Sequence, residues 1–424
     1  MLCYEFRMHE SAAHPRWLRT VQIISLTQVA ILIGFNFAFP FLPLLIEDLG
    51  VTDRGELALW TGLAIGTSGI AMALISPLWG LLADRFGRKT MLVRSVAAGS
   101  ILLALQSAVT NVVQLVAVRI LQGAFTGTQT AASMLIAAIV PKERTGFALG
   151  LLNTGVQVGN LIGPVVGGLV VIALGLRGSF LAGGILLAIC TVITIWMVED
   201  LPVVSRPPLE HGFRGGMREM LVPFSWPGLR GVLIVGAVVQ VMYAGTYALL
   251  AIYVQDLARP AWLSTELTIG LALALGALAA AVAMPILGSY ADRHDARTVL
   301  IFSLASVAVS LIPQALIPNA VVFLLFRLVI GVGLAGTTSS IAVLTRAGSP
   351  LGGEGRAFGT LAAAQNMGWG FGPLIGSAFA AFAGIPALYL AGALGLLLLL
   401  IPVAFSRTWF LPAPAEQPLE VTAP

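Results

Sequence analysis

The chain has 424 residues, of which 58% are hydrophobic and 10% charged, and its mean hydropathy is +0.95. Soluble domains carry about 25% charged residues, so this composition excludes an ordinary soluble protein. The formal net charge of +4 does not indicate nucleic-acid binding, because the basic residues gather in short loops between apolar runs.

Long charge-free runs organise the chain, and a helix needs about 20 apolar residues to cross a bilayer. We predict twelve membrane-spanning helices, over residues 20–46, 57–82, 91–109, 112–139, 146–174, 178–198, 230–255, 267–290, 298–317, 320–346, 357–383 and 386–406. Helices are favoured over a β-barrel because the runs are continuous, without alternation of polar and apolar residues. The first run has no small-residue cleavage pattern, so we do not interpret it as a signal peptide.

The basic residues predict the orientation. Most of the 23 lysines and arginines lie in loops on one side of the predicted membrane, and positive loops stay in the cytoplasm. Both termini are therefore expected inside. The predicted divisions are a tail over 1–19, a bundle over 20–198, a linker over 199–229, a second bundle over 230–406 and a tail over 407–424. Met8 is an alternative start to Met1.

Three landmarks repeat at nearly one offset. GLLADRFGRKTML begins at Gly80 and GSYADRHDARTVL at Gly288, a shift of 208 positions. RILQG begins at Arg119 and RLVIG at Arg327, again 208 apart, and Gly163-Pro164 returns as Gly372-Pro373, 209 later. We infer two homologous six-helix halves in parallel order, an arrangement typical of transporters with a site between the halves.

These motifs resemble a known family. GLLADRFGRK is similar to the loop signature of the major facilitator superfamily, and LVAVRILQGAFTGT (115–128) to its fourth-helix motif. GVQVGNLIGPVVGG (155–168) and the opening FNFAFPFLPLLIEDLGV resemble the drug:proton antiporter branch and bacterial multidrug exporters. The resemblance implies the major facilitator fold and a monomeric, multi-pass transporter of the inner or plasma membrane. Its partners would be the lipid bilayer, a small-molecule substrate and protons, with a proton gradient as driving force and no cofactor, metal or nucleic acid.

The first charged loop is interpreted as a conformational latch. The glycines permit a sharp helix exit and close approach of a neighbour, and an aspartate can accept hydrogen bonds at a helix N-terminus. The resemblance implies that Asp84 holds the first half against the start of the eleventh span when the cavity faces outward. The alternative is that these charges only enforce topology. The latch residues are Gly80, Asp84, Arg85, Gly87 and Arg88. The second copy has Asp295 and Ala296 in place of Gly87 and Arg88, which predicts a weaker latch.

An arginine interrupts the fourth span, and a charge in a membrane span must face a cavity or a polar partner. Arg119 could bind an anionic group of the substrate or brace spans 1 and 4, and both interpretations stay open. Arg327 is interpreted as structural. The predicted cavity or coupling residues are Gln28, Asn36, Arg119, Gln122, Gln240 and Tyr243. Weaker candidates are Phe35, Phe39, Thr126, Gln129, Tyr247, Gln365, Asn366 and Trp369.

The proton site is the least determined feature. Many relatives in the resembled family carry a carboxylate in the first span, but this chain has no acid between Arg19 and Glu47. Glu47 and Asp48, at the outer end of that span, are the predicted proton-coupling residues, with Asp256 and Glu266 as further candidates.

Four glycines in span 5 recur every four residues beside a proline: Gly155, Gly159, Gly163 and Gly167, with Pro164. Small residues at this spacing form a flat face that lets two helix backbones approach closely. The resemblance adds that this face is a seam for alternating access and marks an exporter.

Three functions remain. The first is proton-driven, alternating-access export of drugs or other amphipathic molecules from the cytoplasm. The second is an exporter or flippase for one physiological substrate, such as a lipid, sugar or metabolite. The third, a membrane-embedded enzyme or sensor, finds no cluster of catalytic residues in the spans to support it, so we expect no enzyme activity.

Overall fold

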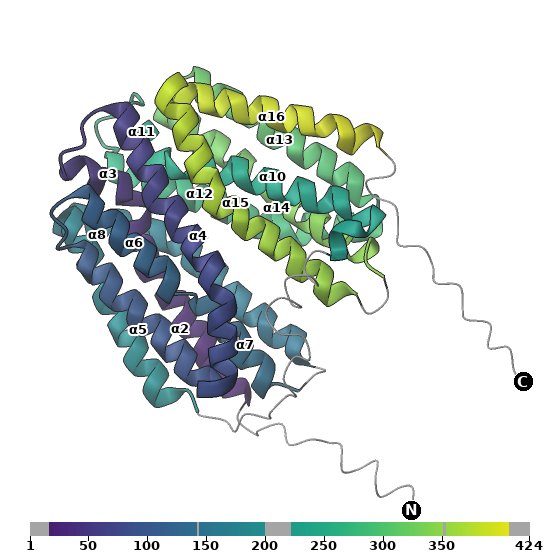
Figure 1. Cartoon of the computed structure of the whole chain (residues 1–424). Helices are drawn as coiled ribbons and strands as arrows, with labels where there is room; N and C mark the ends of the chain where they lie inside the picture. Colours follow the sequence, from purple (N-terminus) through teal and green to yellow (C-terminus); the bar gives the residue numbers. More distant parts are fainter. Residues whose placement is uncertain (1–16, 142–143, 200–221, 351–352, 407–424) are drawn as a thin grey trace, which may run out of the picture.

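A computed structural model describes residues 17–141, 144–199, 222–350 and 353–406. Almost all of these residues are helical (Figure 1). Most of the predicted linker, both tails and the choice between Met1 and Met8 lie outside the described residues, so the predicted domain limits there stay predictions.

The first half contains α2 (Trp17–Ala38), the short 3-10 helix η1 (Phe39–Phe41), α3 (Leu42–Asp48), α4 (Arg54–Phe86), α5 (Arg88–Gln106), α6 (Val112–Phe125), α7 (Thr128–Ile139) and α8 (Thr145–Met197). The second half contains η3 (Val222–Ser225), α10 (Pro227–Ala248), α11 (Leu250–Gln255), α12 (Thr265–Arg293), α13 (Ala296–Leu316), α14 (Ala320–Ala347), α15 (Glu354–Ala383) and α16 (Ile385–Phe405).

These helices follow the twelve predicted spans. Within the described residues, 8 helical stretches are long and apolar enough to cross a membrane, and α8 covers two spans because its backbone turns at Gly175 (φ 74°). The other spans are α5, with its basic first turns, the broken pair α6–α7, and the more polar α15. Large apolar side chains such as Phe382 (94% exposed) and Phe405 (83% exposed) point outward. Such exposure suits contact with lipid, which solvates apolar side chains.

Three spans predicted as continuous helices are broken, which corrects the prediction. Span 4 breaks because Thr126 is extended and Gly127 is left-handed (φ 112°) between α6 and α7. Span 1 breaks at the 3-10 turn η1, which contains Pro40, and span 7 breaks at Leu249. A proline removes a backbone donor, and a left-handed residue ends a helix, so local chemistry overrides the apolar pattern in spans 1 and 4.

The internal repeat is present in the backbone and in the packing. Phe41 and Leu249, 208 positions apart, have nearly the same backbone angles, with φ −99° at both and ψ of 5° and 3°. A Cβ placed on Gly123 would overlap the carbonyl oxygen of Ser68, and one on Gly331 would overlap that of Gly276, again with the same offset. The two halves are therefore built alike, with spans 2 and 4 packed as spans 8 and 10.

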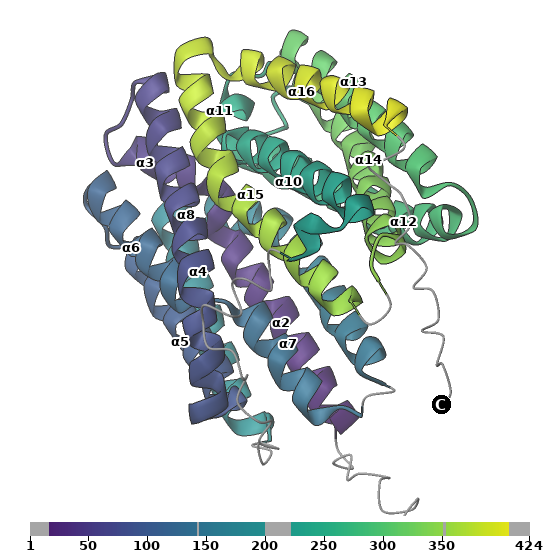
Figure 2. The same ribbon diagram turned by 45° about the vertical axis from the view of Figure 1, so that its right-hand side comes forward.

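The two bundles meet toward one end of the molecule, and their ribbons diverge toward the other (Figures 1 and 2). Contacts between α4 and α15 run from Gly55 against Ala381 to Gly69 against Gly370. Contacts between α8 and α12 pair Gly168 with Glu266 and Pro164 with Gly270. All of these lie in the helix halves remote from the basic loops. We call the end with the α4–α5 and α12–α13 loops the basic side.

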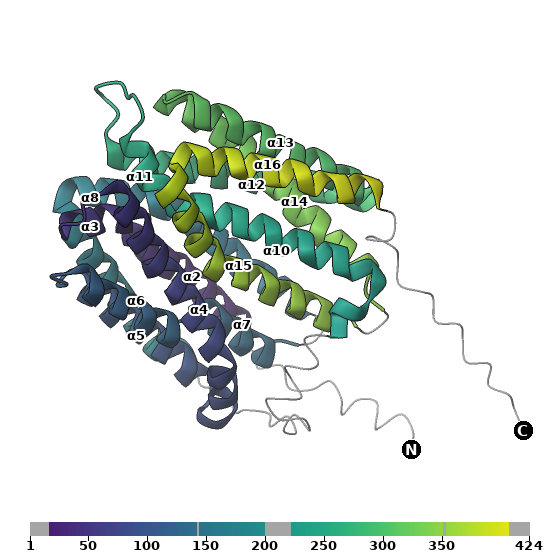
Figure 3. The same ribbon diagram turned by 45° about the horizontal axis from the view of Figure 1, so that its top comes forward.

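With the top of the molecule tilted forward, the helices of each half stay together, and α4 and α15 lie side by side where the halves touch (Figure 3). The first turn of α2 and the last turn of α16 both lie on the side where the bundles diverge (Figure 1). Both ends lie on the same side because each half has an even number of spans.

Candidate functional site

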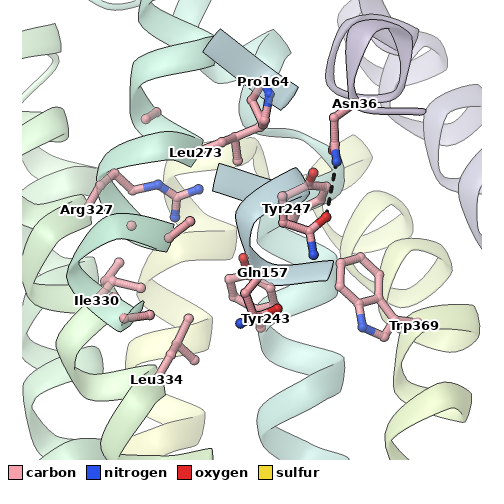
Figure 4. A pocket seen from close by; sticks show the side chains of 16 residues that line it. Asn36, Gln157, Pro164, Tyr243, Tyr247, Leu273, Arg327, Ile330, Leu334 and Trp369 are labelled. Atoms are coloured by element: carbon pink, nitrogen blue, oxygen red, sulfur yellow. Dashed lines mark hydrogen bonds between the residues drawn. The ribbon is translucent and has the colours of Figure 1, made fainter. Parts of the chain in front are cut away.

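A cavity of about 240 Å³ lies between the bundles. Its wall contains residues of α2, α8, α10, α12, α14 and α15 (Figure 4), namely Asn36, Gln157, Asn160, Pro164, Tyr243, Tyr247, Ala272, Leu273, Gly276, Ala277, Ala280, Arg327, Ile330, Gly331, Leu334 and Trp369. On α8 and α12 most of these residues lie on the basic side of the contacts that join the bundles. The cavity is therefore closed on the opposite side by helix packing.

Three aromatic rings form one wall. The ring centroids of Tyr243 and Trp369 are 6.0 Å apart and those of Tyr247 and Trp369 are 5.5 Å apart, both near perpendicular. Tyr247 also lies 6.1 Å from Phe39 of the first half. Edge-to-face packing holds the rings in fixed orientations, so the cavity offers rigid apolar surface. Tyr243 was predicted here, with Tyr247 and Trp369 as weaker candidates.

Amide side chains of α2 and α8 also line the cavity. Asn36 Nδ2 donates to Asn160 Oδ1 at 3.1 Å and to the Leu32 carbonyl oxygen at 2.9 Å. Gln157 lies one turn away on α8 (Figure 4). Asn36 was a predicted cavity residue, whereas Asn160 and Gln157 were not singled out, although a polar residue in an apolar run was an available signal.

Arg327 is the only charged residue among the described residues that line the cavity. Its side chain is 4% exposed, and its Nε has no hydrogen-bond partner within the described part of the chain. The guanidinium lies 5.4 Å from the ring centre of Phe323. The interpretation of Arg327 as purely structural therefore leaves its orientation toward the cavity unexplained (Figure 4).

Arg119 lies inside the first bundle and is not among the cavity residues. Its Nε donates to the Ala64 carbonyl oxygen at 3.3 Å, and its Nη1 donates to Gln122 Oε1 at 2.6 Å. The guanidinium also lies 4.9 Å from the ring centre of Phe39. These contacts connect span 4 with spans 1 and 2, so the geometry favours bracing over substrate binding.

Three other predicted cavity residues also lie apart from it. Gln28 is 1% exposed and its Nε2 donates to Thr128 Oγ1 at 3.3 Å, which connects α2 with α7. Gln122 is 3% exposed and accepts from Arg119 and from Gln106 Nε2. Gln240 packs against Gly368 on α15.

Glu47 and Asp48 lie at the end of the molecule opposite the basic side. Glu47 Oε2 accepts from Gln255 Nε2 of the second half at 2.6 Å. Arg54 reaches the same region of the second half and donates to Gln255 and to Asp256, the latter at 2.8 Å. Asp48 instead pairs with Arg177 of its own half at 3.3 Å. We call the group Glu47, Arg54, Gln255 and Asp256 the outer closure.

The latch residues are placed only in part. Gly80 and Asp84 belong to α4, and the surroundings of both side-chain positions lie outside the described structure. Gly87 joins α4 to α5 and has φ 92°, a backbone conformation that favours glycine. This agrees with the prediction that a glycine permits a sharp exit from the helix here. Arg88 Nη1 donates to the Met134 carbonyl oxygen at 3.1 Å, and Arg85 is exposed.

The second charged loop has a different local structure. Asp295, at the position of Gly87, has φ −81°, and its side chain accepts from the backbone nitrogen of Arg297 and from Thr298 Oγ1. It is an ordinary helix N-cap. This explains why the second copy does not need the glycine.

The glycine stripe packs inside the first bundle. A Cβ placed on Gly155, Gly159, Gly163 or Gly167 would lie against Ser25, Leu32, Asn36 or Phe37 of α2, respectively. These glycines therefore let the backbone of α8 approach α2 closely, as the small-residue spacing predicted. The contact with the other half uses Pro164 and Gly168 instead, so the expected seam between the halves lies beside the stripe.

Trp79 and Arg94 connect the charged loop with the break in span 4. Trp79 Nε1 donates to the Ala124 carbonyl oxygen at 2.6 Å, and Arg94 Nη1 donates to that of Phe125 at 2.7 Å. The Arg94 guanidinium lies 3.5 Å from the Trp79 ring centre. The last carbonyls of a helix lack internal partners, so these side chains stabilise the end of α6. Neither Trp79 nor Arg94 was predicted to have this role, because the break in span 4 was not predicted.

Comparison with known proteins gives a consistent result. The family model described as "Major Facilitator Superfamily" matches residues 24–265 and 232–423 of this chain. Multidrug resistance protein MdtG of Enterobacter lignolyticus is 30% identical over 389 residues, which cover 91% of this chain and 92% of that protein. MdtG of Proteus mirabilis is 33% identical over 364 residues, covering 84% and 88%. Among solved structures, the nucleoside transporter NupG aligns with a TM-score of 0.72 at 15% identity, covering 92% of this chain and 98% of that one.

Proposed function

The chain belongs to the major facilitator superfamily, and on that premise we propose that it exports drugs or other amphipathic small molecules from the cytoplasm by proton antiport. The basic side would face the cytoplasm, following the distribution of positive loops. The protein would act as a monomer, because each chain contains both halves around its own cavity.

The observation that carries the proposal is the cavity between the two halves. It has rigid aromatic surface on α10 and α15, amides on α2 and α8, and a closed end formed by packing of the two bundles. Adaptable apolar contacts with few hydrogen-bonding groups accept varied amphipathic molecules. The names of the relatives, multidrug resistance proteins, support the same substrate breadth.

Proton coupling would involve the outer closure. Glu47 joins the two halves through Gln255, whereas Asp48 pairs within its own half. A proton on Glu47 would remove the charge from that contact and weaken it, since hydrogen bonds to ionised groups are about twice as strong as neutral ones. We therefore favour Glu47 over Asp48.

The test is export by purified protein in proteoliposomes across a panel of neutral, anionic and cationic aromatic compounds. We expect several compounds to move when a pH gradient is imposed, and the rates to fall to those of protein-free liposomes when a protonophore collapses it. Movement of a single compound would favour the alternative, an exporter or flippase for one physiological substrate. No movement of any compound would contradict the proposal.

A further inference from the structure

The two repeat-related arginines differ in their partners. In the first half, Arg119 donates to Gln122 at 2.6 Å, and Gln106 donates to the same amide oxygen at 3.2 Å. The position 208 residues after Gln122 is Ile330, whose side chain cannot accept a hydrogen bond. The amide that holds the arginine in the first half is therefore absent from the second half.

The consequence is a buried guanidinium beside a cavity. Arg327 is 4% exposed, Ile330 is 3% exposed, and both belong to the cavity wall. Nε of Arg327 lacks a hydrogen-bond partner among the described residues. A buried charge without a pairing group is strongly destabilising, because the charge has left water and gained nothing in return.

The surroundings of Arg327 determine what could pair with it. Arg327 also lines a second, small cavity whose wall includes apolar side chains such as Val307 and Leu311. In the first cavity it shares the wall with the rings of Tyr243 and Tyr247 (Figure 4). No acidic residue belongs to the described walls of either cavity. The described walls therefore supply no counter-ion, and an anionic ligand in the cavity would supply one.

Building on the proposed export function, we propose that Arg327 binds the carboxylate or sulfonate head of an amphipathic substrate. The aromatic or apolar body of that substrate lies against Tyr243, Tyr247 and Trp369. A guanidinium is always charged, and its planar fork matches a carboxylate or sulfonate through two parallel hydrogen bonds. The rings accept the body by edge or face contact. The second half supplies the charge selectivity, and the first half keeps its arginine for bracing.

Three dansyl compounds with one aromatic body test the proposal: dansylglycine (anionic), dansylamide (neutral) and dansylcadaverine (cationic). Their dissociation constants are measured by dansyl fluorescence on the purified full-length protein in detergent. We expect wild-type protein to bind dansylglycine at least tenfold more tightly than dansylcadaverine. Arg327→Gln should weaken dansylglycine binding at least tenfold and change dansylamide binding less than threefold.

A second variant keeps the charge and restores the amide of the first half. Ile330→Gln places an amide three residues after Arg327, as Gln122 follows Arg119. We expect it to weaken dansylglycine binding at least threefold, because the new amide occupies the guanidinium. Ile330→Leu is the matched apolar control for the change at this wall position and should weaken dansylglycine binding less than Ile330→Gln does. Thermal unfolding of each variant separates lost binding from lost folding.

Two outcomes would overturn the inference while export stands. One is an equal loss of affinity for all three compounds in Arg327→Gln, which would indicate a structural role. The other is wild-type protein that binds the cation as tightly as the anion. If wild-type protein neither binds nor transports any of the three compounds, nor any compound of the panel, the export proposal fails and this inference fails with it.

Discussion

At the scale of single residues, Arg119 is held by the shape of its side chain as well as by its charge. Nε and Nη1 reach two different acceptors, and the ring of Phe39 covers the plane. A lysine keeps the charge but has no planar fork. We expect Arg119→Lys and Arg119→Ala to lower stability alike, by about 1–3 kcal/mol for lost charged hydrogen bonds.

The measurement for Arg119 is the midpoint of thermal unfolding in detergent. Arg327→Lys serves as the matched control, since Arg327 Nε makes no hydrogen bond in the described structure, and should unfold near the wild-type temperature. A wild-type midpoint for Arg119→Lys, or an altered preference between anionic and cationic dansyl compounds, would contradict the bracing role.

Glu47 is the residue in which proton and conformation could be coupled. Glu47→Gln mimics the protonated carboxyl, so we expect export that no longer responds to a pH gradient, with substrate affinity within threefold of wild type. Asp48→Asn, beside it but paired with Arg177, should keep the response. A normal pH-driven rate in Glu47→Gln would place the proton route elsewhere.

At the scale of elements, the break in span 4 depends on the backbone at Gly127. Its φ is 112°, and apart from the glycine and the two residues next to it in the chain, nothing lies within 4 Å of a Cβ placed there. The cost of Gly127→Ala is therefore conformational, roughly 1–2 kcal/mol for a left-handed L-residue. We expect a lower unfolding midpoint, together with weaker protection of the amides at the end of α6 from hydrogen exchange.

Gly150 offers a matched control for that substitution. It lies in α8 with equally open space around its Cβ position, but its φ is not positive. Alanine favours a helix over glycine by up to about 1 kcal/mol, so Gly150→Ala should leave the midpoint unchanged or raise it. Equal midpoints for both variants would show that the break does not require a left-handed residue.

At the scale of the whole molecule, the packing of α4 against α15 holds the bundles together on the side opposite the basic loops. A Cβ on Gly55 would lie 3.9 Å from Ala381 Cα, which suits a disulfide between the two helices. In a variant with Cys3 and Cys190 replaced, we expect oxidised Gly55→Cys/Ala381→Cys to stop transport and reduction to restore it. Each single-cysteine variant should transport under the same oxidant. Unimpaired transport by the oxidised pair would mean that the two helices need not separate.

The latch is a second test at this scale, because it would act in the conformation where the basic ends approach each other. Asp84→Asn should leave the protein folded and inserted but impair transport severely. A lost charge-assisted contact is worth about 1–3 kcal/mol, enough to change a two-state ratio roughly tenfold or more. The measurement is transport by purified protein, compared at equal amounts with wild type. Normal transport would leave the charges with a topological role only.

Much of the architecture follows from the sequence by itself. Whether a segment can enter a membrane depends on its summed hydropathy, and the direction of each span depends on the charges beside it. Both are local properties, so the twelve spans were predictable, as was the division between α8's two spans. The repeat was visible because duplicated packing requires the same residues at the same offset, as at Gly123 and Gly331.

Only the tertiary structure decided which arginine meets the cavity. Arg119 and Arg327 occupy the same position in the repeated motif. Arg119 bonds to Gln122, whereas Arg327 lines the cavity, because the residue that corresponds to Gln122 in the second half is Ile330. The pairing of Glu47 with Gln255 likewise joins residues of different halves. A side chain's partners depend on the rotation of its helix and on segments hundreds of residues away. Hydropathy and spacing along one chain do not contain that information.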